Sequence, residues 1–230
     1  MPIGDLAQHM LANICFYTQN SFPVYDDIAK RAIPGIEKFS SSNSSNNLVD
    51  TDKSIPLTFM EQCSLAELTA ELSTSCYAGV LMLQAMGLGG WMFDGIDRHT
   101  ILGASGDPNV QGLGFRYDTN KNWSIPNPTG LPGIFEGFCP PHYKDMRDAT
   151  EALSKRKFGE GGVYNPETPG SWKNSPKVRG NAKPYTEEFK ECVALQAQYI
   201  YDTYGKFPAD IPSIFCLMYV QAQHIDLEFL

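Results

Sequence analysis

The segment from Ser64 to Met86 constrains the fold more than any other part of the chain. Ser64, followed three residues later by Glu67, matches a helix-capping box, and the apolar residues after it recur at helical spacing. The first half of this predicted helix is amphipathic, whereas residues 78–86 are apolar almost all round. A helix of that kind is typical of a protein interior. We therefore expect 78–86 to be buried in the centre of a domain or of an oligomer.

A group of glycines ends this predicted helix, and a short strand follows it. Gly87 can supply the left-handed cap that often terminates a helix, and Gly89 and Gly90 come soon after it. Residues 91–93 form a short apolar run that predicts a buried strand. Because glycine has no Cβ, this backbone can approach a flat ligand closely, and strand amides can hydrogen-bond to ring nitrogens. The segment is therefore a candidate ligand site.

Apolar spacing and capping residues predict the other elements. Two Gly/Pro-rich segments, 120–141 and 158–184, indicate irregular crossings, and the polar, low-complexity segment 40–54 predicts a mobile surface loop. Asp97 and Thr186 are expected helix caps. The predicted fold class is α+β and predominantly helical. Further helices are expected at 3–20, 97–102, 142–157, 185–204 and 211–229, and a further strand at 110–117.

Composition excludes some classes of partner and indicates a compartment. The chain has 230 residues, with 18 basic and 26 acidic side chains, a net charge of -8 and a pI near 5.0. Such a chain repels phosphate backbones and anionic headgroups, so neither a nucleic acid nor a membrane is expected as a partner. The six cysteines are scattered without a CxxC motif, and no apolar run approaches the ~18 residues of a membrane span. We expect reduced thiols and a cytoplasmic protein.

Residues 71–97, ELSTSCYAGVLMLQAMGLGGWMFDGID, carry a family resemblance. They resemble the late core helix and following strand of the flavin-dependent nitroreductase superfamily, in which a buried helix ends in a Gly-Leu-Gly-type turn. Downstream, Ile101–Gly103, Pro108 and Gly112–Phe115 are similar to that family's helix, spacer and last core strand. The resemblance covers about residues 66–117.

The resemblance implies an organisation for the whole chain. Residues 1–120 would form a nitroreductase-like core portion, with the mobile loop at 40–54 as an insertion. Residues 121–230 would supply a Gly/Pro-rich crossing and an added C-terminal helical region. Members of this superfamily are typically intertwined homodimers that share flavin sites between subunits, so a homodimer is expected.

The resemblance also implies how FMN would be held. Phe93 would pack on the isoalloxazine ring, and the backbone amides of Asp94 and Gly95 would face its hydride-accepting edge. The family's Arg-rich phosphate motif near the N-terminus has no match here, and its late basic pair is matched only by Lys177 and Arg179. Met92 stands where the family often has proline. The expected cofactor-binding residues are Gly89, Gly90, Met92, Phe93, Asp94, Gly95, Lys177 and Arg179.

The activity implied by the resemblance is that of an FMN-dependent oxidoreductase. NADH or NADPH would donate hydride to the flavin, which would then reduce a small electron-poor acceptor such as a nitroaromatic or a quinone. No side-chain acid or base is obligatory in such chemistry, so no catalytic residue is named. The alternative is a catalytically silent helical interaction or scaffold protein that retains part of a flavin fold.

Three further sets of residues allow a chemical or a structural role. His224 and Glu228 would share a face of a helix and, with Asp226, could hold a metal, although structural hydrogen bonding is the commoner role. Cys139 and His142 could form a nucleophile pair, but two prolines separate them. The aromatic residues Trp123, Phe135 and Phe138 could roof a planar ligand or anchor a long loop.

Overall fold

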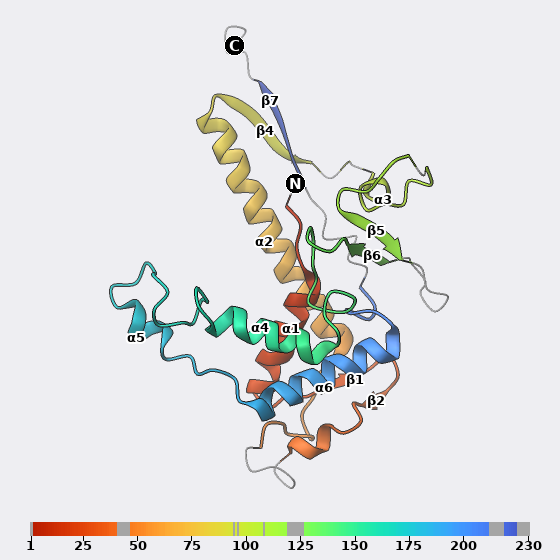
Figure 1. Ribbon diagram of the computed structural model, residues 1–230, viewed down its shortest axis with the longest axis vertical. Helices are drawn as coiled ribbons and strands as arrows, with labels where there is room; N and C mark the ends of the chain where they lie inside the picture. Colours follow the sequence, from red (N-terminus) through yellow and green to blue (C-terminus); the bar gives the residue numbers. More distant parts are fainter. Residues whose placement is uncertain are drawn as a thin grey trace.

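Helices dominate the computed structural model, and short strands connect them (Figure 1). The structure describes residues 2–40, 47–93, 95, 97–107, 109–118, 127–211 and 219–224. The fold is mixed α+β, which confirms the expected class. The helices are α1 (Leu6–Gln19), α2 (Leu57–Ala85), α3 (Arg98–Ile101), α4 (Met146–Phe158), α5 (Ser175–Arg179) and α6 (Glu187–Tyr204), with a 3-10 helix at Ile36–Phe39. The strands are β1 (Val24–Asp26), β2 (Arg31–Ala32), β3 (Ile55–Pro56), β4 (Leu88–Phe93), β5 (Phe115–Asp118), β6 (Asn127–Gly130) and β7 (Tyr219–His224).

The main hydrophobic core lies where α1, α4 and α6 pack against one another (Figure 1). Met10 and Ile14 of α1, Met146 of α4 and Ile200 of α6 are completely buried there. Burying one such side chain contributes about 1.5–3 kcal/mol. Each of the three helices begins at a capping side chain that accepts a hydrogen bond from a backbone N–H in the first turn. These caps are Asp5, Asp145 and Thr186.

The helix α2 begins earlier than the sequence pattern predicts. It starts at Leu57, and Pro56 occupies the capping position without a side-chain hydrogen bond. Ser64 lies inside the helix, where its hydroxyl donates to the carbonyl oxygen of Met60 at 2.9 Å, so the predicted cap at Ser64 is wrong. Leu57 and Met60 are fully buried, and their burial stabilises the turns of α2 that precede Ser64.

The second half of α2 is exposed in the single chain, so the expectation that 78–86 is buried within a domain is wrong. Tyr77 is 56% exposed, Met82 61% and Met86 65%. Figure 1 shows this half extending beyond the helices of the core, with β4 and β7 beside it. No helix in the described part of the chain, α2 included, combines the length and the apolar character needed to cross a membrane.

The C-terminal helix expected at 211–229 is also wrong, because residues 219–224 form the strand β7. This strand pairs antiparallel with β4, from Leu88 opposite His224 to Phe93 opposite Tyr219. The six residues of β4 present backbone donors and acceptors that need partners, and β7 supplies them. Residues 212–218 and 225–230 of the expected helix lie outside the described residues.

A buried carboxylate on α2 fixes the segment that leads from α6 toward β7. Glu61 is 1% exposed, and its oxygens accept hydrogen bonds from the backbone N–H groups of Ala209, Asp210 and Ile211 at 2.6, 3.0 and 3.1 Å. Burial raises the pKa of Glu61, while these three N–H groups oppose that rise. The chain after α6 is therefore held against the first half of α2.

The remaining expectations differ from the structure mainly at element ends. The helix α4 begins at Met146 because Asp145 caps it, and β5 begins at Phe115. The expected crossing at 120–141 contains β6, which pairs with β5, and the expected loop at 158–184 contains α5. The helices α1, α3 and α6 lie within their predicted ranges. The expected caps at Asp97 and Thr186 are confirmed.

The expected mobile loop at 40–54 is described only in part. Residues 41–46 lie outside the described residues. After them, the backbone N–H of Val49 bonds to the carbonyl oxygen of Phe39, and the Val49 side chain is completely buried in the main core. The described end of this segment is therefore anchored by Val49.

The carboxylate of Asp26 connects β1 to α6. It is fully buried and accepts hydrogen bonds from the hydroxyls of Tyr199 and Tyr204 at 2.7 Å and from the backbone N–H groups of Ile28 and Ala29 at 3.1 and 2.8 Å. Burial alone would raise the pKa of Asp26, but these hydrogen bonds together hold it below its usual value. The ionised form is therefore the one that the fold stabilises.

We expect Asp26→Asn to lower the free energy of unfolding at neutral pH by about 1–3 kcal/mol, because buried donors lose their charged acceptor. A lowered pKa means that the stabilisation is present above the unfolded-state value and is lost as pH falls through the folded-state value. Denaturant unfolding from pH 7 to pH 3 should therefore show a smaller acid-induced loss for the variant than for the wild type. The exposed Asp52→Asn is the control, and parallel profiles for wild type and Asp26→Asn would contradict the assignment.

Candidate functional site

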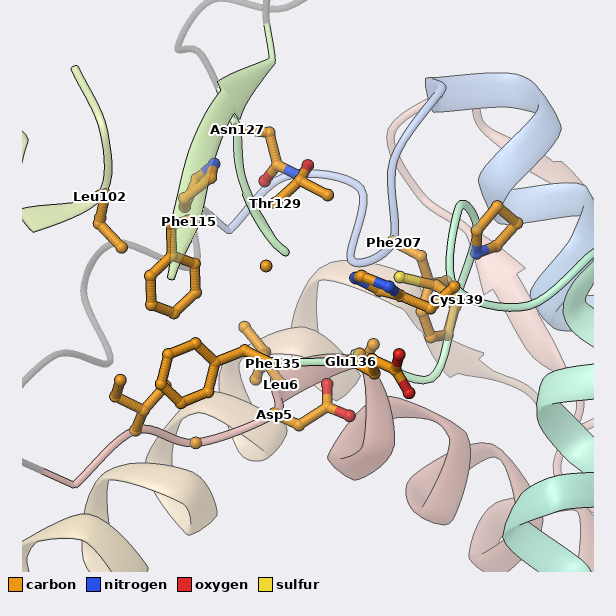
Figure 2. A pocket seen from close by; sticks show the side chains of 18 of the residues that line it. Asp5, Leu6, Leu102, Phe115, Asn127, Thr129, Phe135, Glu136, Cys139 and Phe207 are labelled. Carbon is orange, nitrogen blue, oxygen red and sulfur yellow. The ribbon is translucent and has the colours of Figure 1, made fainter. Parts of the chain in front are cut away.

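A cavity of about 300 Å3 lies between five separate parts of the chain (Figure 2). Its walls come from the N-terminal segment 3–7, Leu102 after α3, the paired strands β5 and β6, the loop 131–142, and the segment 207–208 that follows α6. Because these segments are distant in sequence, the cavity exists only once the chain has folded. It is at the small end of the range for ligand pockets.

Aromatic rings form one wall of this cavity. The rings of Phe115 and Phe135 stack with their centroids 4.7 Å apart and an interplanar angle of 10°. Figure 2 shows this pair on one side of the cavity and Phe207 on another. Thr129 lies between them on the wall formed by β6. The cavity thus offers a flat apolar surface next to polar groups.

A carboxylate at the start of α1 forms part of the floor. The two oxygens of Asp5 accept hydrogen bonds from the backbone N–H of Gln8 at 3.2 Å and from that of Phe138 at 3.0 Å. Burial raises the pKa of Asp5, and the hydrogen bonds oppose the rise without cancelling it. Asp5 therefore joins α1 to the loop 131–142 and places a desolvated carboxyl group at the cavity.

The Cys139–His142 pair is not arranged as an activated nucleophile. Both residues line the cavity, and the backbone N–H of His142 bonds to the carbonyl oxygen of Cys139 at 3.2 Å. Burial, assisted by the negative charge of Asp5, raises the pKa of the Cys139 thiol to about 12. The thiol therefore stays protonated at neutral pH and does not supply a thiolate.

The aromatic residues of the predicted crossing divide between the two roles that the sequence allows. Phe135 lines the cavity, whereas Phe138 is buried in the main core with its ring 5.4 Å from that of Tyr143. Trp123 lies outside the described residues. The density of aromatic residues and the Cys139–His142 pair were the sequence signals that pointed toward this cavity.

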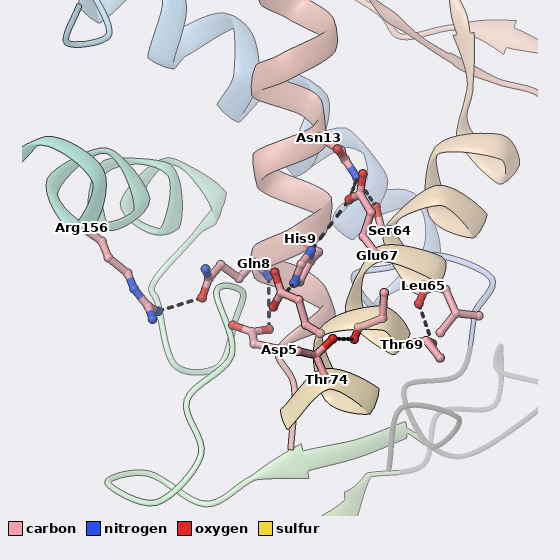
Figure 3. Close-up of polar contacts among 12 residues, drawn as sticks. Asp5, Gln8, His9, Asn13, Ser64, Leu65, Glu67, Thr69, Thr74 and Arg156 are labelled. Carbon is pink, nitrogen blue, oxygen red and sulfur yellow. Dashed lines mark hydrogen bonds and ion pairs between the residues drawn. The ribbon is translucent and has the colours of Figure 1, made fainter. Parts of the chain in front are cut away.

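Polar contacts fix the first half of α2 to α1 (Figure 3). The amide of Asn13 donates to the hydroxyl of Ser64 and to the carboxylate of Glu67, both at 2.9 Å. One turn away, the imidazole of His9 lies 3.3 Å from the carboxylate of Glu71. These contacts end where the exposed half of α2 begins. We refer to that exposed half together with β4, residues 77–93, as the apolar arm.

The predicted ring-binding residues lie at the end of the apolar arm. Gly87 adopts a φ of 74° and turns the chain from α2 into β4, as the glycine pattern predicts. In β4, Gly89 and Gly90 pair with Gln223 and Ala222 of β7. The strand expected at 91–93 is confirmed, but its expected burial is wrong, because Trp91 and Met92 are 43% exposed and Phe93 is 40% exposed.

The two residues after β4 are described only in part. Asp94 lies outside the described residues, so the structure gives no position for its amide. Gly95 is exposed, and a Cβ added to it would collide with the ring of Phe93. The ring of Phe93 therefore lies directly against the Gly95 backbone, and a larger residue at 95 would require this ring to shift.

The predicted phosphate-binding pair lies elsewhere in the molecule. Lys177 and Arg179 belong to α5, which Figure 1 places at a different extremity from β4. Lys177 is exposed. The guanidinium of Arg179 is buried and donates to the hydroxyl of Ser175 at 3.1 Å and to the backbone carbonyls of Pro169, at 3.1 Å, and Val163.

These positions bear on how FMN could be held. The strand β4 presents glycines followed by partly exposed apolar side chains. The pair Lys177 and Arg179 lies on α5, which is remote from β4, and each of the three guanidinium nitrogens of Arg179 already donates a hydrogen bond within the fold. Of the expected residues at 89–95, the structure describes five close together in sequence at the end of the apolar arm, and it leaves the basic pair apart.

The metal hypothesis loses its geometric basis. His224 belongs to the strand β7, so the four-residue helical spacing to Glu228 does not apply, and Asp226 and Glu228 lie outside the described residues. Among the described residues, no group of three or more His, Cys, Asp or Glu side chains is placed to hold a metal ion.

Comparison of the chain with protein-family models, with curated proteins and with solved structures finds no match. Its function must therefore be argued from the residues and geometry described above. Two regions carry that argument: the apolar arm and the cavity beside Asp5.

We expect Arg179→Gln to lower the free energy of unfolding by about 1–3 kcal/mol, because the substitution removes the hydrogen bonds that the buried guanidinium donates to the backbone carbonyls of Val163 and Pro169. Lys177→Gln, at an exposed position on the same helix, should change it by no more than about 0.5 kcal/mol. Denaturant unfolding measures both. Neither substitution should change the retention of added FMN; a loss of retention in folded Lys177→Gln would instead assign the pair to the phosphate.

Proposed function

We propose that this chain is an FMN-dependent oxidoreductase of the nitroreductase type, and that β4 carries the flavin ring. The order helix, glycine turn and strand with exposed apolar side chains carries the proposal. The reductant would be NADH or NADPH, and the acceptor a small electron-poor molecule such as a nitroaromatic or a quinone. We further infer a cytoplasmic location, which the free thiols of the described cysteines support: Cys15, Cys63, Cys76, Cys139 and Cys192.

The order of elements after β4 adds support. The short helix α3 follows β4, and the strand β5 follows α3. This is the order of helix, spacer and strand that the family resemblance implies for 101–115. The cap of α3 is Asp97, whose carboxylate accepts from the backbone N–H groups of His99 and Thr100. The order of α3 and β5 therefore supports the proposal, while their bounds differ from the resembling segments: α3 ends at Ile101 and β5 begins at Phe115.

The chain's own task would be to bind and orient two ligands in turn. A flavin supplies the hydride and electron chemistry itself when it is bound. The backbone of β4 can lie close to a planar ring at Gly89 and Gly90, and the side chain of Phe93 can pack against that ring. The phosphate would have to be held by groups other than Lys177 and Arg179.

We propose that two copies of the chain meet through the apolar arm. From Leu72 to Phe93 the sequence contains no charged residue, whereas each copy carries a net charge of -8. Two such chains repel one another over most of their surfaces, so an uncharged surface is where they can approach. Exposed apolar patches of this kind mark association surfaces. A second copy would bury the side chains that the single chain leaves in solvent.

A second candidate function is that of an interaction or scaffold protein without flavin. The separation of α5 from β4 favours it, because Lys177 and Arg179, the basic pair expected for the cofactor phosphate, do not lie beside the strand. In this case the apolar arm would serve association alone. Flavin retention separates the two candidates.

We expect the purified chain, mixed with excess FMN and then desalted, to keep the visible absorption of bound flavin. Gly90→Val should reduce this retention, because a branched side chain would occupy the surface where the ring approaches the backbone. Its thermal unfolding midpoint should fall by no more than about 4 °C. Equal losses of flavin and of stability would identify a structural turn, and a wild type that never retains FMN would favour the scaffold function.

We expect the wild type to be a dimer in sedimentation velocity and Met82→Glu to be a monomer, because the new carboxylate would lie in the apolar contact. Phe59→Glu is the matched control. Phe59 is 49% exposed on the first half of α2, outside the apolar arm, and its replacement should leave the dimer intact. A monomeric wild type, or dissociation of both variants, would contradict the proposed interface.

A further inference from the structure

The cavity of Figure 2 combines negative charge with aromatic surface. The carboxylates of Asp5 and Glu136 both line it, and the stacked rings of Phe115 and Phe135 form another wall. Figure 2 shows both carboxylates toward the lower part of the cavity, apart from the Phe115 ring. A ligand that touched both regions would need a charged or polar end and an apolar body.

The carboxylates at the cavity have no lysine or arginine opposite them. Among the described residues that line the cavity, His142 is the only one whose side chain can carry a positive charge. Asp5 accepts two backbone N–H bonds, and Glu136 accepts one from Gly133 at 2.8 Å. A carboxylate has about four acceptor positions, so both groups keep room for a further donor.

The effect of this charge is visible at neighbouring groups. Burial raises the pKa of Tyr143, and the charges of Asp5 and Glu136 raise it further. Burial likewise raises the pKa of Asp5 itself. A desolvated carboxyl group is unfavourable in its ionised form. The charge of His9 offsets part of this penalty for Asp5, and a cation in the cavity would offset more of it.

The cavity is partly open to solvent, so its volume sets the size of the part of such a cation that it could enclose. At about 30 Å3 for each water-sized group, 300 Å3 holds on the order of ten non-hydrogen atoms. That is the size of an amine with one aromatic ring and a short chain. An amino group donates to carboxylates, and an aromatic ring stacks on a phenylalanine wall.

We propose that this cavity binds a small primary amine with an aromatic or compact apolar body, as its ammonium cation. The ammonium group contacts the carboxylates of Asp5 and Glu136, and the apolar body lies against Phe115 and Phe135. This site is separate from the proposed flavin surface on β4, since none of its lining residues belongs to β4. A failed test of this amine site would therefore leave the oxidoreductase proposal unaffected.

The test is isothermal titration of the full chain with three probes that share one carbon skeleton. These probes are phenethylamine, 2-phenylethanol and phenylacetate. We expect the amine to bind at least tenfold more tightly than the alcohol, and phenylacetate not to bind, because the carboxylates repel it. Equal binding of amine and alcohol, preference for the anion, or no binding of the amine would each overturn the proposal.

Variants then connect binding to the named groups. Glu136→Gln removes an exposed charge and should weaken amine binding several-fold without altering the unfolding midpoint. Asp5→Asn keeps a good helix cap and should weaken it tenfold or more. Glu160→Gln, an equal change of charge at an exposed position outside the cavity, is the control. Unchanged amine binding in folded Glu136→Gln and Asp5→Asn would contradict the assigned contacts.

Discussion

The buried carboxylate of Glu61 is the contact on which both candidate regions depend. By accepting three backbone N–H groups at 209–211, it holds the chain that leaves α6 against the first half of α2. Just before this contact, Phe207 and Pro208 line the cavity. After it, the chain reaches β7, which covers one edge of β4. The three hydrogen bonds of this one carboxylate therefore hold the segment after α6, which forms one wall of the cavity, against α2.

Local signals in the sequence predicted those features that depend on a few neighbouring residues. The caps at Asp97 and Thr186 and the glycine turn at Gly87 are of this kind, because a side chain or a φ value decides each one. The same local logic failed at Ser64. Its spacing to Glu67 imitates a capping box, but both side chains instead bind Asn13 of α1, a contact that exists only in the folded chain.

Features that depend on distant partners could not be predicted in this way. Residues 219–224 have apolar spacing compatible with a helix, and their pairing with β4 decides in favour of a strand. The cavity is a stronger case, because its walls come from segments at both ends of the chain. Asp5 illustrates the difference: its role as a helix cap is local, whereas its hydrogen bond to the backbone of Phe138 and its place at the cavity arise from the tertiary fold.

The apolar arm shows what an all-apolar helix pattern does and does not determine. The pattern at 78–86 predicts that these side chains avoid water, but it does not specify which surface covers them. Within the chain, Leu6 packs against Leu68 and Leu72 of α2. The strands β4 and β7 lie along the later turns of the helix. Met82 and Met86 still remain more than half exposed. The hydrophobic effect that buries the first half of α2 inside the fold acts equally on the second half, so a second copy would complete the burial that the single chain leaves unfinished.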